Sequence, residues 1–175
     1  MYEKKSVIRD IVIPFDSYPH LNENQTLKEA IEAFMSYRGG GQDRLLYAML
    51  LVVNDESQLV GKLSLNDVIY GLAPRLMDAT RVDKFEGKGG EYQDLALLYE
   101  ESTFATCGEN QSQKIKPLIR AINFSLPADT HILKALVMMS QRDDFSVPVT
   151  DNGIFIGVLR LEEIFTAMCN VYCVI

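Results

Sequence analysis

LVVNDESQLVGKLSLNDVI at residues 51–69 and VPVTDNGIFIGVLRLEEIF at residues 147–165 share one pattern. Each stretch opens with an apolar run and passes through an Asp-containing turn into a second apolar run with one glycine. A polar residue then starts another apolar pattern. This order predicts strand, turn, strand and helix, present twice. Duplicated units usually stack on each other, and the cleft between them is a natural place for a ligand.

The flanking sequence adds a helix before each copy. Thr26 with Glu29 forms a capping-box pattern, and apolar residues then recur at helical spacing. The continuous apolar run at 47–53 predicts a strand buried on both faces, and Asn152-Gly153 predicts a tight hairpin. The expected helices are 27–37, 66–71, one through Ile132, Ala135, Leu136 and Met139, and 162–171; the expected strands are 47–54, 58–63, 145–150 and 154–159.

The domain organisation follows from these two copies. Residues 1–71 are predicted as the first repeat and 115–175 as the second, with extended arms at 11–13 and 115–122. Between them, 72–114 is a connecting insert, interrupted by glycines at 87–90 and expected to be helical over 94–104.

Composition limits the classes of function. The chain has 175 residues, 47% of them apolar, which suits one compact domain or two tightly joined small ones. Its net charge of −7 argues against non-specific nucleic-acid binding. The start shows no signal peptide, and the longest apolar run, 45–53, is too short to span a membrane. A soluble, cytoplasmic protein without a membrane or nucleic-acid partner is therefore expected.

The cysteines and histidines give weak signals. Cys169 and Cys173 are four residues apart on an expected helix, where a metal or redox pair is one interpretation and reduced buried thiols are the favoured one. His20 and His131 lie far apart without companions at ligand spacing, so no metal site is expected.

The chemistry-bearing segment is Gly61-Lys62-Leu63-Ser64-Leu65-Asn66-Asp67. The two-residue period of a strand puts Lys62 and Ser64 on one side, and Asp67 lies one turn into the following helix. Two interpretations stay open. Ser64 and Asp67 form a near capping box that only satisfies helix amides. Alternatively, they face a cleft in which the carboxylate holds a sugar diol while the amides and Lys62 hold a phosphate.

These motifs resemble a tandem pair of cystathionine-β-synthase (CBS) domains, a Bateman module of the stand-alone bacterial type. The resemblance is carried by Gly-x-x-Ser-x-x-Asp at 61–67, by Thr-Leu-x-x-Ala-Ile at 26–31 and by the apolar strand ending in Asp55. It implies an α/β fold of two β-α-β-β-α repeats packed sheet to sheet with pseudo-twofold symmetry, plus the partly helical insert. It also implies two clefts for adenosine-containing ligands: AMP, ADP, ATP, S-adenosylmethionine or sometimes NAD.

The resemblance further implies roles for individual residues. Asp67 would hold the ribose hydroxyls, Ser64 the ribose or phosphate, and Lys62 would lie beside the base or reach the phosphate. The opposite wall of this cleft would come from four residues: Pro117, Ile122, Asp144 and Phe145.

The second copy departs from the family pattern. Arg160 stands where Ser or Thr is expected, and Glu163 replaces Asp. The second cleft is then either degenerate and plugged, which is favoured, or it recruits a more phosphorylated ligand through Arg160. Val158 would also line it, and its opposite wall would contain Arg9, Ile13 and Met49.

The resulting expectation is a regulatory module, not an enzyme, that senses an adenine nucleotide as an energy signal. It would form a homodimer through its helical faces and act on a separate effector protein. The main alternative is a ligand-free dimerisation or interaction scaffold in which Ser64 and Asp67 only cap a helix. An enzyme using Cys169 and Cys173 is a further alternative.

Overall fold

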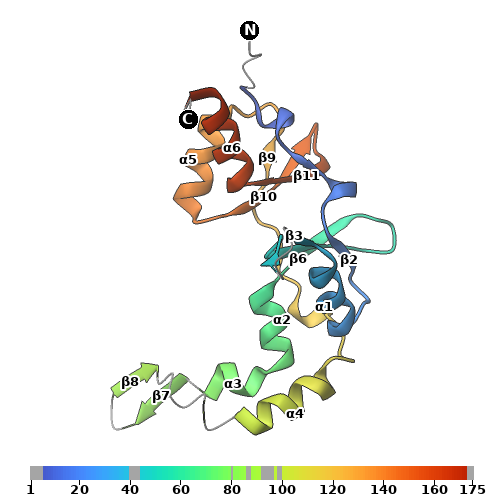
Figure 1. Ribbon diagram of the computed structural model, residues 1–175, viewed down its shortest axis with the longest axis vertical. Helices are drawn as coiled ribbons and strands as arrows, with labels where there is room; N and C mark the ends of the chain where they lie inside the picture. Colours follow the sequence, from blue (N-terminus) through green and yellow to red (C-terminus); the bar gives the residue numbers. More distant parts are fainter. Residues whose placement is uncertain are drawn as a thin grey trace. The chain divides into compact units, whose positions relative to one another are not determined.

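The structure is a computed structural model that describes residues 6–39, 44–79, 81–85, 88–91, 97 and 100–172. The chain divides into two compact units, His20–Ala121 and Met1–Pro19 with Ile122–Ile175. Figure 1 shows strands and helices in both of them. Among the described residues, no helix is long and apolar enough to cross a bilayer.

The unit His20–Ala121 is built on the sheet β2-β5-β6. Its strands are β2 (His20–Asn22), β5 (Met49–Val53) and β6 (Leu59–Ser64), and its first two helices are α1 (Leu27–Ser36) and α2 (Leu65–Leu72). All five residues of β5 are buried, as the continuous apolar run predicts. The core joins both helices to this sheet through Leu27, Ala30, Phe34, Leu50, Val52, Leu63 and Val68.

The remaining elements of this unit lie between α1 and β5, in the insert, or directly after the insert. They are β3 (Arg38–Gly39), β4 (Arg44–Leu45), α3 (Pro74–Ala79), β7 (Arg81–Phe85), β8 (Lys88–Glu91), α4 (Glu100–Asn110) and the 3-10 turn η4 (Lys116–Leu118). The amide of Asn110 donates to the carbonyl of Leu72 at 3.0 Å, which ties the end of α4 to the end of α2.

The other unit repeats the plan with the sheet β1-β11-β10-β9. Its elements are η1 (Ile8–Asp10), β1 (Ile13–Pro14), η2 (Phe15–Ser17), β9 (Leu126–Pro127), α5 (Ile132–Arg142), β10 (Ser146–Asp151), β11 (Ile154–Arg160) and α6 (Leu161–Tyr172). Asn152 and Gly153 have φ of 48° and 81°, the left-handed values that a tight hairpin requires. Core residues of α5, α6 and the sheet meet in one cluster around Ala135, Met139, Val149, Leu159 and Ile164.

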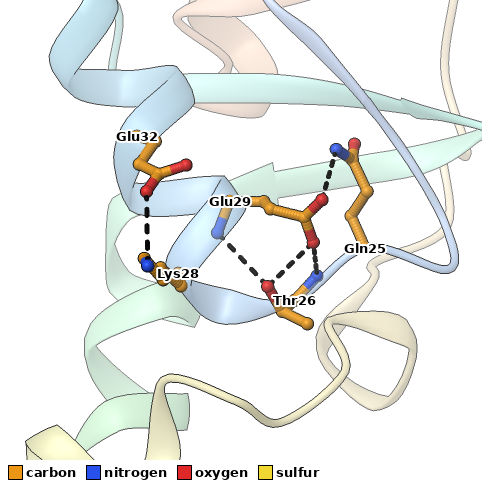
Figure 2. Close-up of polar contacts among 5 residues, drawn as sticks. All are labelled: Gln25, Thr26, Lys28, Glu29 and Glu32. Atoms are coloured by element: carbon orange, nitrogen blue, oxygen red, sulfur yellow. Dashed lines mark hydrogen bonds and ion pairs between the residues drawn. The ribbon is translucent and has the colours of Figure 1, made fainter.

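Helix α1 begins with the predicted capping box, shown in Figure 2. The backbone amide of Glu29 donates to Thr26 Oγ1 at 3.3 Å, and the amide of Thr26 donates to Glu29 Oε2 at 2.7 Å. Gln25 Nε2 donates to the other carboxylate oxygen at 3.1 Å. These bonds satisfy amides at the helix start that have no partner within the helix.

Each sheet is completed by an arm from elsewhere in the chain. Residues 113–120 form the arm of the unit His20–Ala121, with antiparallel bridges from Lys114 to Thr26 and from Arg120 to Lys62. The N-terminal residues form the arm of the other unit, where Val7 bridges to His131 and β1 pairs with β11. The two arms thus make equivalent contacts, although one is N-terminal and the other follows the insert.

The helices and strands predicted for the repeats agree with these elements to within two residues at their ends. The insert differs more, because α4 occupies Glu100–Asn110, whereas the helix was expected at 94–104. Of that expected span, residues 94–96, 98 and 99 lie outside the described residues. Gly89 and Gly90 belong to strand β8, so this part of the expected interruption is a strand. Gly87 and Cys173, which the sequence analysis also names, lie outside the described residues.

Candidate functional site

Asp67 is the one buried charged residue among those that the structure describes, with 5% of its surface exposed. Strand β6 leads directly into α2, and Ser64 is the N-cap residue between them, with extended backbone. Asp67 Oδ2 accepts from the Ser64 backbone amide at 2.9 Å and from its hydroxyl at 2.6 Å, while the Asp67 amide donates to Ser64 Oγ at 3.2 Å. The capping box that the spacing allows is therefore complete.

Arg120 supplies the second partner of this carboxylate. Its Nε donates to Asp67 Oδ1 at 2.5 Å, and the two side chains differ greatly in exposure, at 66% for Arg120 and 6% for Asp67. The guanidinium thus lies over a carboxylate that is otherwise enclosed. A charge-assisted bond of this kind compensates the cost of burying the carboxylate.

Lys62 lies directly opposite Arg120. Each backbone amide donates to the other residue's carbonyl at 2.9 Å, which is the hydrogen-bonded pair of an antiparallel bridge. Lys62 and Ser64 are half-buried while Leu63 is fully buried, so the predicted two-residue alternation is confirmed. The ammonium group of Lys62 has no hydrogen bond or ion pair with any described residue.

Gly61 allows the arm to approach β6 this closely. A Cβ at position 61 would lie against the side chain of Ile119 and 2.7 Å from the carbonyl oxygen of Arg120. Gly157 has the same place in the other unit, where a Cβ would collide with the backbone of Ile13 and Pro14. The glycine in each repeat is therefore explained by the arm that crosses it.

The other residues predicted for the first cleft are divided between the units. Pro117 lies exposed in η4, three residues before Arg120 on the same arm. Ile122, Asp144 and Phe145 belong to the other unit. There, Asp144 forms an ion pair with Arg142 at 3.5 Å, and Phe145 is exposed with its carbonyl accepting from the Leu161 amide at 3.0 Å.

The second copy carries an ion pair at the positions that correspond to Ser64 and Asp67. Arg160 Nε and NH2 donate to the two carboxylate oxygens of Glu163 at 2.9 and 2.5 Å, and both side chains are about one-fifth exposed. Val158 lies two residues before Arg160 on β11 and pairs with Ile13. Four of the predicted residues therefore belong to one unit: Ile13, Val158, Arg160 and Glu163. Met49, the fifth, pairs with Ser64 in the other unit.

Arg9 lies at the opposite end of β11 from Arg160. Its guanidinium donates to both carboxylate oxygens of Asp151, at 2.6 and 2.9 Å. Asp151 is the last residue of β10, next to the hairpin turn. This bond raises the pKa of Arg9 and lowers the pKa of Asp151. Arg9, Asp129, Asp151 and Asn152 help to line a pocket of about 430 Å³ at this turn. The structure therefore does not bring Arg9 together with Arg160 and Glu163.

Arg120 is the residue that the sequence analysis missed. Its neighbours on the arm were named, but only the pairing of Arg120 with Lys62 shows which arm side chain reaches Asp67. In the described part of the chain, no cluster of three or more His, Cys, Asp or Glu is placed so that it could hold a metal ion.

Comparison with known proteins identifies the repeats. The model of the CBS domain matches two segments, residues 8–74 and 116–170. The chain belongs to the CBS-domain family. No curated protein matches its sequence.

Solved structures agree with this assignment. This CBS-domain protein is similar to CBSX2, solved with AMP, at a TM-score of 0.63 and 15% identity over 95% of this chain and 99% of that one. It is similar to a CBS-domain protein of unknown function from Bacillus anthracis at 0.63 and 14%, over 96% of each chain. The CBS domain of a bacterial CNNM/CorC family Mg2+ transporter, solved with ATP, gives 0.62 and 13%, over 94% and 88%. At these identities the likeness shows the fold, a tandem CBS pair.

Proposed function

We propose that this CBS-domain protein is a regulatory module that binds an adenosine-containing nucleotide at Lys62, Ser64 and Asp67 and performs no chemistry. The observation that carries the proposal is the buried carboxylate of Asp67, which is covered by Arg120, while Lys62 pairs with Arg120 on the adjacent strand. Carboxylates bind sugar diols by accepting two hydrogen bonds, and adjacent cations attract phosphate. Two CBS-domain structures of the same fold were solved with AMP and with ATP.

The mechanism of such a module is thermodynamic. A ligand that binds one arrangement of the protein more tightly shifts the population toward that arrangement. The change in the protein surface is then read by a separate effector protein, and the size of the response is limited by the difference in ligand affinity between the two arrangements. We propose a cytoplasmic homodimer as the acting form, with adenine nucleotide as an energy signal.

The test is isothermal titration calorimetry of the purified protein with AMP, ADP, ATP, S-adenosylmethionine and NAD, repeated on Asp67→Ala. At least one of these ligands should bind the wild-type protein, and Asp67→Ala should weaken it by at least about tenfold, since a charge-assisted hydrogen bond to the ribose is lost. Asp55→Ala is the matched control, because its carboxylate accepts from Asn22 Nδ2 at 2.8 Å in the turn between β5 and β6, at the other end of β6 from Ser64. Wild-type protein that binds none of the five ligands would refute the sensor.

A ligand-free interaction scaffold is the second candidate, and the completed capping box favours it. Both carboxylate oxygens of Asp67 are already used by Ser64 and Arg120, so the site is chemically satisfied without a ligand. In that case Asp67→Ala should lower the stability of the ligand-free protein by about 1–3 kcal/mol, the cost of an unmade buried bond and a lost cap. If none of the five ligands binds and Asp67→Ala is less stable than the wild type, the scaffold is supported.

A further inference from the structure

We infer that the Asp67 site accepts only phosphorylated nucleosides, and that Arg120 is the residue that makes the phosphate necessary. The inference rests on the proposed function and concerns the regulation and ligand class of the same site. It separates AMP, ADP and ATP from adenosine and from S-adenosylmethionine.

The first step is that Arg120 competes with a ribose for Asp67. Oδ2 already accepts from the amide and the hydroxyl of Ser64, and neither donor leaves without breaking the start of α2. Oδ1 accepts from Arg120 Nε. A ribose diol that donates to this carboxylate must therefore displace the guanidinium or share the oxygen with it. A nucleoside with no other attraction to the site binds weakly, because its binding breaks the charge-assisted bond between Arg120 and Asp67.

The second step is that a phosphate offers Arg120 a new partner. A guanidinium has five N–H donors, and only the Nε–H contacts an acceptor in the described part of the chain, while the side chain is largely exposed. Lys62 and Arg120 form a hydrogen-bonded antiparallel pair, which places their side chains on one face with Cβ atoms about 5 Å apart. A phosphate between them receives a bidentate contact from Arg120 and the unpaired charge of Lys62.

The third step concerns S-adenosylmethionine. Its sulfonium carries a positive charge at the position where the nucleotides carry phosphate. Beside Lys62 and Arg120 the sulfonium charge is repelled, and the methionine carboxylate lies several bonds farther from the ribose than a 5′-phosphate, so it is a poorer new partner for Arg120. The site should therefore discriminate against this ligand even though its adenosine part is identical.

Removing the guanidinium should have opposite effects on two ligands. In Arg120→Ala, adenosine should bind more tightly than to the wild type because Oδ1 is free, whereas AMP should bind more weakly because its phosphate loses a bidentate contact. The ratio of the adenosine and AMP dissociation constants should fall by at least about tenfold. Arg120→Lys, which keeps the charge but not the planar fork, should retain more of the AMP affinity.

The experiment is calorimetric titration of adenosine, AMP and S-adenosylmethionine into the full chain, as wild type, Arg120→Ala, Arg120→Lys and Lys116→Ala. Lys116 is the matched control, because it lies on the same arm, is equally exposed and forms an ion pair with Glu23 at 3.2 Å. Lys116→Ala should keep the wild-type ratio. Thermal unfolding of each variant confirms that it is folded.

Several results would overturn the inference. Equal weakening of adenosine and AMP in Arg120→Ala would make Arg120 a residue that merely positions Asp67. Equal tightening would show competition without phosphate recognition. Binding of S-adenosylmethionine more tightly than AMP to the wild type would refute the ligand class while leaving the sensor intact. Binding of none of the ligands to the wild type would refute the sensor and this inference together.

Discussion

Gly61 and Gly157 show at the scale of single residues why the repeat has its sequence. Both lie on the second strand of their hairpin at the point where an arm crosses, and at each a Cβ would collide with the backbone of that arm. The glycine is therefore needed for close approach, and its negative φ carries no strain. In the unit His20–Ala121 the crossing arm carries Arg120, so Gly61 also positions the residue that covers Asp67.

Gly61→Ala should destabilise the protein by about 1–3 kcal/mol, because the new methyl forces the arm away from β6. Equilibrium denaturation with urea measures this change. Gly108 is the matched control, since it lies in α4 and a Cβ there has open space around it. Gly108→Ala should stabilise the protein by about 0.5–1 kcal/mol through helix propensity. A Gly61→Ala protein as stable as the wild type would show that the arm does not need this contact.

Ser64 and Asp67 also show how far the site could be predicted. Their spacing fixes a strand-to-helix junction with a carboxylate one turn in, and the structure has both, with Lys62 on the expected face. Arg120 could not be found in this way. Its contact with Asp67 spans 53 positions in the sequence and depends on the register of the arm against β6, which no local pattern encodes.

At the scale of the elements, helix starts were predictable because capping is local chemistry. Thr26 with Glu29 satisfies the amides at the start of α1 through contacts within three residues (Figure 2). The insert was less predictable, since α4 has few apolar residues in a helical pattern and none of its side chains is fully buried. Its position is set by contacts such as that of Asn110 with Leu72, which the sequence alone does not reveal.

The capping box at the start of α1 should also make the free energy of unfolding depend on pH. The backbone and hydroxyl hydrogen bonds of Thr26 hold the pKa of Glu29 below its ordinary value of 4.5. A carboxylate with a lowered pKa in the folded state contributes stability above its unfolded pKa, and this contribution is lost as the pH falls through the folded value. The free energy of unfolding should therefore decrease below about pH 4.5, the value of the unfolded group.

Glu29→Gln should remove part of this acid dependence, because the amide cannot be protonated there. Urea denaturation at pH 7 and pH 3 should give a smaller difference for Glu29→Gln than for the wild type. Glu32→Gln is the control on the same helix, since Glu32 has only an exposed ion pair with Lys28 at 4.0 Å (Figure 2). An unchanged difference in Glu29→Gln would contradict the role of the capping carboxylate.

At the scale of the whole molecule, each unit has exposed apolar side chains on helices that pack against its sheet. On α1 and α2 these are Met35, Ile69 and Tyr70; on α5 and α6 they are Leu133, Val137 and Phe165. Apolar side chains clustered on a surface helix are typical of an interface. Exposed apolar side chains thus occur on helices of both units. A second copy of the chain would present the same apolar side chains, against which they could pack. This supports the homodimer that we propose.

Phe165→Glu tests that dimer. Phe165 is 67% exposed on α6, and its burial in the proposed dimer would contribute about 1.5–3 kcal/mol for each copy. Replacing it with a charge should weaken dimerisation by at least about tenfold, as measured by sedimentation equilibrium over a range of concentrations. Ile154→Glu is the control, because Ile154 is 71% exposed but lies at the turn end of β11, away from α5 and α6. If Ile154→Glu dissociates the protein and Phe165→Glu does not, the interface lies at the hairpins, and the helical faces must have another role.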